Sequence, residues 1–241
     1  KPYFAVYATF AQRAYDQMIH DVCMQNWPVT FLVDRAGLSA HDGETHHGVF
    51  YLAEFVPVPN MMVLCPRDLN ELRQMMRFSQ HCERPLAICY GRDSVLLDRF
   101  RCKAFTPGVW ETLVNGEDLT ILSVGSMVKE ALSTAELLRD QGLHARVVNC
   151  SSVKPMDECV LEKIADRPII TMEEHALLGG FGSLVDSFYV RRGLNVKKLS
   201  FGIPDAFIQH GARGVLLRSL GLLPEQMTER IAGFLSNKER K

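Results

Sequence analysis

Short β-type runs alternate with segments of helical period along this chain, and this alternation restricts its possible folds more than any other feature of the sequence. In the first half, strand-like runs at 3–7, 29–33, 61–65 and 85–90 are separated by helical segments, of which the clearest lie at 9–25 and 68–80. No short hairpin turn joins neighbouring strand-like runs. Strands separated by helices of this length pair in parallel through right-handed crossovers, so the sequence predicts an α/β fold.

The alternation restarts in the second half, after a break in periodicity around Pro107, Gly108, Asn115 and Gly116. Further strands are expected at 119–124, 144–150, 168–172 and 196–200, and further helices at 127–141, 157–165, 182–192, 212–220 and 224–237. We therefore expect two three-layer α/β/α units with mainly parallel sheets, over residues 1–100 and 119–241, joined by a linker over 101–118. The first unit has few strands and starts abruptly at Lys1 without a methionine, so we expect a domain cut from a longer chain.

Charge and composition exclude several classes of protein. The 27 Lys and Arg residues nearly balance the 28 Asp and Glu residues, for a net charge of −1, so the sequence predicts neither nucleic-acid nor membrane binding. No apolar run approaches the roughly 18 residues that span a bilayer. The 7 cysteines form no C-x-x-C pair and have no histidine at metal-ligand spacing. We expect free thiols, a cytoplasmic protein and no metal site within this chain.

The loop from 34 to 48 holds the densest group of chemically active residues, and it follows a predicted strand. Ligands bind beyond the carboxyl ends of strands in open parallel sheets, which makes this loop a candidate site. It contains Arg35, His41, Asp42, Glu44, His46 and His47. A histidine could transfer protons near neutral pH, and an arginine could hold a phosphate or carboxylate. The histidines could equally be surface residues, metal ligands at an unfavourable spacing, or helix-entry residues.

Three other segments give weaker signals. Tyr7, Phe10 and Arg13 follow the first strand and could stack on a flat heterocycle, although aromatic residues at helical spacing also fit a core. Arg92 follows the strand at 85–90 and could clamp an anion or simply be solvated. The run 173–183 approaches a predicted helix through glycines, which could expose a helix N-terminus to an anion or serve tight packing.

These residues lie in a segment that is recognisable as a whole. The sequence YATFAQRAYDQMIHDVCMQNWPVTFLVDRAGLSAHDGETHHGVF resembles the thiamine-diphosphate-dependent 1-deoxy-D-xylulose-5-phosphate synthases. The likeness continues through LCPRDLNELRQMM, SSVKPMDE, MEEHALLGGFGS and FGIPDAFIQHG, and so covers essentially the whole chain. DRAG followed by HDGETHHG is specific, because transketolases and the β chains of 2-oxo-acid dehydrogenases share the architecture but resemble this loop less well.

The resemblance implies a fold, a reaction and a set of site residues. Residues 1–100 would be the later part of a pyrimidine-binding domain, and 119–241 a transketolase C-terminal domain. The family condenses pyruvate with glyceraldehyde 3-phosphate, with loss of carbon dioxide, in the synthesis of isoprenoid, thiamine and pyridoxal precursors. By resemblance, the cofactor pyrimidine would be bound by Tyr7, Phe10 and Arg13, and the acceptor phosphate by Arg35 and Arg92, while His46 and Asp42 would be the catalytic residues. Arg92 stands in YGRD where the family more often has YPRG.

The resemblance also implies that much of an active site lies outside these 241 residues. The family's activating glutamate, in an AEQH-like motif, and its diphosphate-binding domain with the GDG-type magnesium motif have no counterpart here. We therefore expect a C-terminal fragment of a homodimeric transferase, inactive alone, whose Mg²⁺ ligands are not in this chain. Two alternatives stay open: a non-catalytic binding or assembly protein that keeps the fold, and a subunit of a split transketolase-like enzyme.

Overall fold

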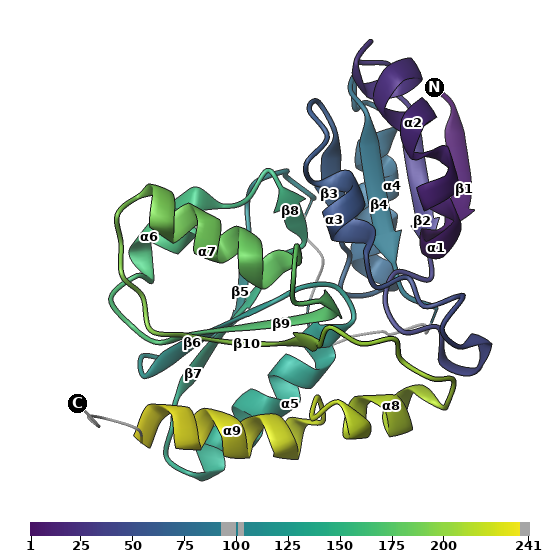
Figure 1. Cartoon of the computed structure of the whole chain (residues 1–241). Coiled ribbons are helices and arrows are strands. Elements are labelled where there is room, and N and C mark those ends of the chain that lie inside the picture. Colours follow the sequence, from purple (N-terminus) through teal and green to yellow (C-terminus); the bar gives the residue numbers. More distant parts are fainter. Residues whose placement is uncertain (93–99, 101–103, 237–241) are drawn as a thin grey trace.

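Two five-stranded sheets form the framework of the protein in a computed structural model, which describes residues 1–92, 100 and 104–236 (Figure 1). The first sheet has the order β1-β2-β4-β3-β8. Its strands are β1 (Tyr3–Tyr7), β2 (Thr30–Asp34), β3 (Met62–Leu64), β4 (Leu86–Tyr90) and β8 (Ser152–Lys154). All pairs are parallel except β3 with β8. The predicted parallel α/β sheet is confirmed.

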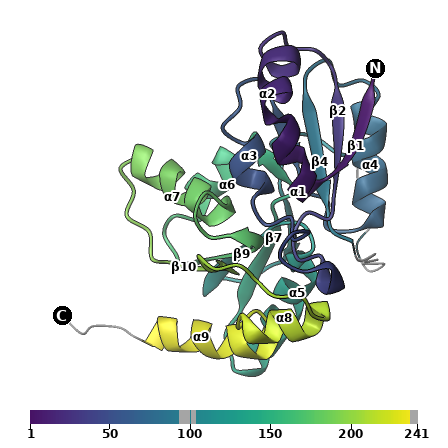
Figure 2. The same ribbon diagram turned by 45° about the vertical axis from the view of Figure 1, so that its right-hand side comes forward.

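Helices cover both faces of the first sheet. One face carries a helical run made of α1 (Ala8–Ala11), a 3₁₀ turn (Gln12–Ala14), α2 (Tyr15–Gln17) and a π-helical turn (Met18–Cys23), together with α3 (Tyr51–Phe55). The opposite face carries α4 (Leu69–Ser79), as Figure 2 shows. Side chains of β4 alternate between the two faces, so that Leu86 and Ile88 share a cluster with Met75 of α4, whereas Ala87 and Cys89 face the other core.

The second sheet has the order β10-β9-β6-β7-β5. Its strands are β5 (Glu111–Val114), β6 (Leu119–Ser123), β7 (Ala145–Asn149), β9 (Ile169–Ala176) and β10 (Lys198–Ile203). Helices α6 (Glu158–Lys163) and α7 (Phe181–Arg191) lie on one face, and α5 (Met127–Asp140) and α9 (Pro224–Ser236), preceded by α8 (Arg213–Ser219), lie on the other (Figure 1). The helices expected in this half are confirmed, with ends that shift by one or two residues.

Two strands were not predicted, and both lie at a sheet edge. β5 falls within 101–118, the segment expected to be a linker, and pairs antiparallel with β7. β8 comes from the second half of the chain but completes the first sheet. Both strands are short, so neither shows a periodic pattern of its own. Their conformation depends on pairing with distant strands, which a local pattern does not contain.

Apolar side chains from both halves pack into one core between the sheets. Trp110 stands edge-on to Phe181, with ring centres 5.8 Å apart, and its indole N–H donates to the Ser152 carbonyl over 2.8 Å. Phe55 of the first unit belongs to the same buried cluster. This shared core fixes the carboxyl edge of the first sheet relative to the second unit.

The structure also bears on the cysteines and on membrane insertion. Six cysteines are free thiols within the described part of the chain, namely Cys23, Cys65, Cys82, Cys89, Cys150 and Cys159, whereas Cys102 lies outside it. Burial raises the pKa of the Cys89 and Cys150 thiols well above the ordinary value. Among the described residues, no helix is both long and apolar enough to cross a membrane.

Candidate active site

Three strands of the first sheet end side by side, and the candidate residues follow directly. In register, Tyr7 at the end of β1 pairs with Asp34 at the end of β2, which pairs with Tyr90 at the end of β4. Arg35 is the next residue after β2, and Arg92 comes two residues after β4. Parallel pairing therefore brings three segments that are far apart in sequence to one edge of the sheet.

The backbone turns sharply where β2 ends. Arg35 has φ of +59°, a left-handed conformation that is uncommon outside glycine. The Asp34 carboxylate accepts a hydrogen bond from the Arg35 amide over 2.7 Å and so stabilises this turn. The turn directs the Arg35 side chain across β1, where its guanidinium carbon lies 4.0 Å from the centre of the Tyr7 ring. Its Nη2 also donates to the Tyr7 hydroxyl over 3.0 Å.

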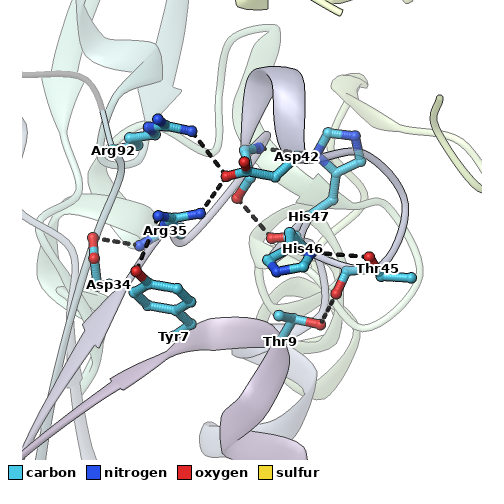
Figure 3. A network of polar contacts seen from close by, with 10 residues as sticks. Tyr7, Thr9, Asp34, Arg35, Asp42, Thr45, His46, His47 and Arg92 are labelled. Carbon is cyan, nitrogen blue, oxygen red and sulfur yellow. Dashed lines mark hydrogen bonds and ion pairs between the residues drawn. The ribbon is translucent and has the colours of Figure 1, made fainter. Parts of the chain in front are cut away.

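Arg35 and Arg92 converge on one oxygen of Asp42 (Figure 3). Arg92 Nη1 lies 2.8 Å from Asp42 Oδ2, and Arg35 Nη1 donates to the same atom. The Arg35 side chain is 18% exposed and the Arg92 side chain 45% exposed, so the cluster opens toward solvent on the Arg92 side. The two guanidiniums are planar forks of N–H donors at one place, which suits a bound anion with several oxygens, such as a phosphate.

His46 lies beside this cluster, in contact with the residues that follow β1. Its Nδ1 is 2.9 Å from the Thr45 hydroxyl, and its ring is edge-on to Phe10, with centres 5.4 Å apart. Phe10 stacks against Tyr7 at 5.6 Å and an interplanar angle of 22°. The Arg13 guanidinium lies 5.2 Å from the centre of the Phe10 ring. The structure thus brings together the seven residues that the family resemblance implies for the site, namely Tyr7, Phe10, Arg13, Arg35, Asp42, His46 and Arg92.

Hydrogen bonds within the loop orient His46 and its neighbours. The Ser39 hydroxyl donates to the His46 carbonyl over 2.6 Å, and the Ser39 amide donates to Nδ1 of His47 over 2.9 Å. His47 is 4% exposed, and its Nε2 lies 3.3 Å from the Gln209 carbonyl of the second unit. His47 is therefore an internal brace of the loop, whereas His41 and Glu44 are exposed on its surface.

The glycine-rich run at 173–183 is not an open anion site. The strand expected to end at residue 172 continues as β9 through Ala176, with Glu173, Glu174 and His175 all buried. Glu173 accepts hydrogen bonds from the amides of Phe181 and Gly182, over 2.5 and 2.8 Å, at the start of α7. Burial raises the pKa of the Glu173 carboxyl to about 7. The N-terminus of this helix thus binds the protein's own carboxyl group.

Sequence reasoning missed the residues of the second unit that contact the 34–48 loop. Glu174 reaches the Leu38 amide, and the Gly211 amide donates to the Ala40 carbonyl over 3.2 Å. The available signal was the pair of carboxylates in a buried strand, since charged residues are rarely buried without a partner. The sequence did not show which loop they contact.

Comparisons with known proteins agree with this architecture. The family model of the transketolase pyrimidine-binding domain matches residues 1–96, and that of the transketolase C-terminal domain matches residues 108–227. The 1-deoxy-D-xylulose-5-phosphate synthase of Aquifex aeolicus is 44% identical over 240 residues, which is 98% of this chain and 38% of that protein. The synthase of Halalkalibacterium halodurans is 43% identical, covering 100% of this chain and 39% of its own length.

The chain belongs to the 1-deoxy-D-xylulose-5-phosphate synthase family. It spans 38–39% of the length of these synthase relatives. Among solved structures, a split-gene transketolase described as an inactive β4 tetramer superposes with a TM-score of 0.87 at 28% identity, covering 99% of this chain and 77% of its own. A transketolase mutant from Pichia stipitis has a TM-score of 0.77 at 21% identity, covering 97% of this chain and 34% of its own, and shares the fold.

Proposed function

We propose that this chain carries the acceptor site and the pyrimidine side of the cofactor site of a 1-deoxy-D-xylulose-5-phosphate synthase. The complete enzyme would condense pyruvate with glyceraldehyde 3-phosphate and release carbon dioxide. The observation that carries the proposal is the convergence of Arg35 and Arg92 on Asp42, next to His46, at the carboxyl edge of a parallel sheet. A phosphorylated acceptor needs a cationic site beside a group that can move protons.

The acceptor would bind by exchange of partners in the arginine–aspartate cluster. The oxygens of its phosphate would accept hydrogen bonds from the guanidinium groups of Arg35 and Arg92, whose planar forks of N–H donors match phosphate geometry. Asp42, released from part of its ion pairing, could then accept a hydrogen bond from an acceptor hydroxyl. His46, beside the ring expected to stack on the cofactor, would exchange a proton with an acceptor oxygen.

The residues after β1 fit the heterocycle of thiamine diphosphate. Phe10 and Tyr7 are half-buried aromatic rings at the carboxyl edge, which suits stacking against a flat pyrimidine. Arg13, over the Phe10 ring, would line the same pocket. When bound, thiamine diphosphate supplies the electron sink for decarboxylation and carbon–carbon bond formation. The role of this chain is to orient the cofactor and the acceptor, and to move protons.

The described part of this chain has no site for the Mg²⁺ that would accompany the diphosphate of the cofactor. Within residues 1–92, 100 and 104–236, no group of three or more His, Cys, Asp or Glu side chains could hold a metal ion. We therefore propose that Mg²⁺ and the cofactor diphosphate are bound by a diphosphate-binding domain outside this chain. On this proposal the chain is inactive alone, and the complete enzyme is a cytoplasmic homodimer that binds no nucleic acid or membrane.

The test compares this chain with the complete enzyme that carries it. With thiamine diphosphate and Mg²⁺, the complete enzyme should release carbon dioxide from pyruvate and form 1-deoxy-D-xylulose 5-phosphate when glyceraldehyde 3-phosphate is added. The chain alone should do neither. Calorimetry should show cofactor binding to the chain weaker than micromolar, which corresponds to about −8 kcal/mol. Transfer of two-carbon units between sugar phosphates, without pyruvate, would instead indicate a transketolase.

A second candidate is a subunit of a split transketolase-like enzyme. It is favoured by the TM-score of 0.87 to the split-gene transketolase, of which this chain covers 77%. Under this alternative, a separately encoded partner with the diphosphate-binding domain would restore activity when mixed with this chain. Activity only when both parts belong to one polypeptide would favour the first candidate.

A further inference from the structure

A carboxylate of the second unit forms a hydrogen bond with the backbone of the 34–48 loop, which carries part of the candidate site. Glu174 belongs to β9, yet its Oε1 accepts a hydrogen bond from the Leu38 amide over 2.8 Å. The two residues are 136 positions apart in the sequence. Glu174 is 5% exposed, so this contact is shielded from water. A charge-assisted hydrogen bond in such surroundings is stronger than one between neutral groups at the surface.

Other side chains hold the Glu174 carboxylate in place. Its Oε2 accepts from the Ser126 hydroxyl over 3.0 Å and from Nη2 of Arg213 over 2.5 Å. Arg213 in turn donates to Glu130 over 2.9 Å through Nη1. Arg213 therefore bridges two carboxylates, of which only Glu174 contacts the loop. The Ser126 and Arg213 side chains therefore set the direction of the Glu174 side chain toward the Leu38 amide.

The loop is shaped to receive this carboxylate. Gly37 has φ of +113°, and a Cβ atom there would lie 2.9 Å from Glu174 Oε1. The absence of a side chain at this position thus allows the close approach. Gly37 and Leu38 lie between Arg35 and Asp42, the two residues that form the inner ion pair of the site. Glu174 forms no hydrogen bond or ion pair with Arg35 or Asp42, both of which the structure describes, but its hydrogen bond to Leu38 restrains the backbone between them.

We propose that Glu174 is a positioning residue of the acceptor site. Its hydrogen bond to Leu38 sets the spacing between Arg35 and Asp42, and Arg213 keeps Glu174 in the required orientation. The second unit thereby contributes to acceptor binding without contacting the acceptor. The kinetic part of this inference rests on the proposed function, whereas its structural part concerns the loop alone.

The structural part is tested by hydrogen exchange of the Leu38 amide in the full chain, with resolution of single amides. Glu174→Ala should speed its exchange by about tenfold or more, since a buried amide loses a charged acceptor. Glu174→Gln should speed exchange less than Glu174→Ala does, because the glutamine oxygen still accepts from the Leu38 amide, although more weakly than a carboxylate. The matched control is Glu130→Gln, which also removes one carboxylate from Arg213 but should leave Leu38 unchanged. Equal exchange in all three variants would overturn the proposal.

The kinetic part is tested in the complete enzyme with the same variants. Glu174→Ala should raise KM for glyceraldehyde 3-phosphate by about tenfold while KM for pyruvate changes less than about twofold. Glu130→Gln should change neither, although it also weakens the buried ion cluster. If Glu174→Ala does not fold, Glu174→Gln carries the comparison. Faster exchange at Leu38 with no change in either KM would refute the positioning role. If the complete enzyme without substitutions makes no product, the proposed function is refuted, while the exchange result still stands.

Discussion

The imidazole of His46 stands edge-on to the ring of Phe10, with the ring centres 5.4 Å apart and the planes at 70°. Phe10 follows β1 and His46 follows β2, so this contact joins two loops that meet only because the strands pair in parallel. On the proposed function, it places the candidate proton-transfer group next to the ring expected to stack on the cofactor pyrimidine. Substitution of His46 should therefore affect catalysis in a specific way.

His46→Ala should lower kcat of the complete enzyme by about 10²-fold or more, the usual loss for a positioned proton-transfer group. The fold should be nearly unaffected, because a half-buried loop histidine contributes little to core packing. Steady-state kinetics and a thermal melt measure the two effects. The control is His41→Ala, an exposed histidine of the same loop, which should keep wild-type turnover. Equal turnover in the two variants would show that the catalytic role was assigned to the wrong residue.

Arg35→Ala should raise KM for glyceraldehyde 3-phosphate much more than KM for pyruvate, which carries no phosphate. Arg92→Ala should have the same selectivity with a smaller effect, because its side chain is 45% exposed against 18% for Arg35. Initial-rate measurements with each substrate varied in turn would show the difference. A parallel rise for both substrates would indicate a general structural defect instead of the loss of a phosphate ligand.

Glu54→Gln should stabilise the protein at alkaline pH. Burial raises the pKa of the Glu54 carboxyl from 4.5 to about 7, and its Oε2 has no hydrogen-bond partner among the residues that the structure describes. The folded state therefore holds this proton more tightly than the unfolded state, and stability falls as pH rises from about 4.5 to 7, then levels off. At pH 8 the variant should be more stable by about 1–2 kcal/mol, less than the full shift implies because solvent partly screens the group.

Urea denaturation at pH 5 and pH 8 measures this effect. The gain in the free energy of unfolding should be close to zero at pH 5 and appear at pH 8. Glu83→Gln changes an exposed carboxyl and serves as the control, with no gain expected at either pH. An equal gain at both pH values would mean that Glu54 acts through packing and not through ionisation.

Trp110→Ala should destabilise the protein by about 3–5 kcal/mol, the usual range for removal of a large buried aromatic side chain. Trp110 is 6% exposed, contacts Phe181 and donates to the Ser152 carbonyl, so it joins both units although it lies in a segment expected to be a linker. Its neighbour Val109 is 56% exposed, and Val109→Ala should be nearly neutral. Similar midpoints in denaturant for the two variants would show that the segment is only a connection.

The sequence by itself determined the secondary structure of most of the chain and the set of candidate residues. Short continuous apolar runs, separated by helical segments, predicted β1, β2, β4, β6 and β7, because a strand buried on both faces of a parallel sheet has apolar residues at consecutive positions. The same reasoning placed Arg35 and Arg92 after strand ends. The family resemblance then implied that the two arginines bind one phosphate, which the strand pattern alone left open.

Only the tertiary structure decided how these residues pair. That Arg92 shares the Asp42 oxygen with Arg35, and that Glu173 binds the start of α7 while the adjacent Glu174 binds Leu38, depends on contacts that form only when the chain folds, within each unit or, for Leu38, between the two units. The edge strands β5 and β8 were hidden for the same reason. A local pattern records periodicity and conformational preference, but the partner of a buried polar group is set by which backbones the folded core brings within hydrogen-bonding distance.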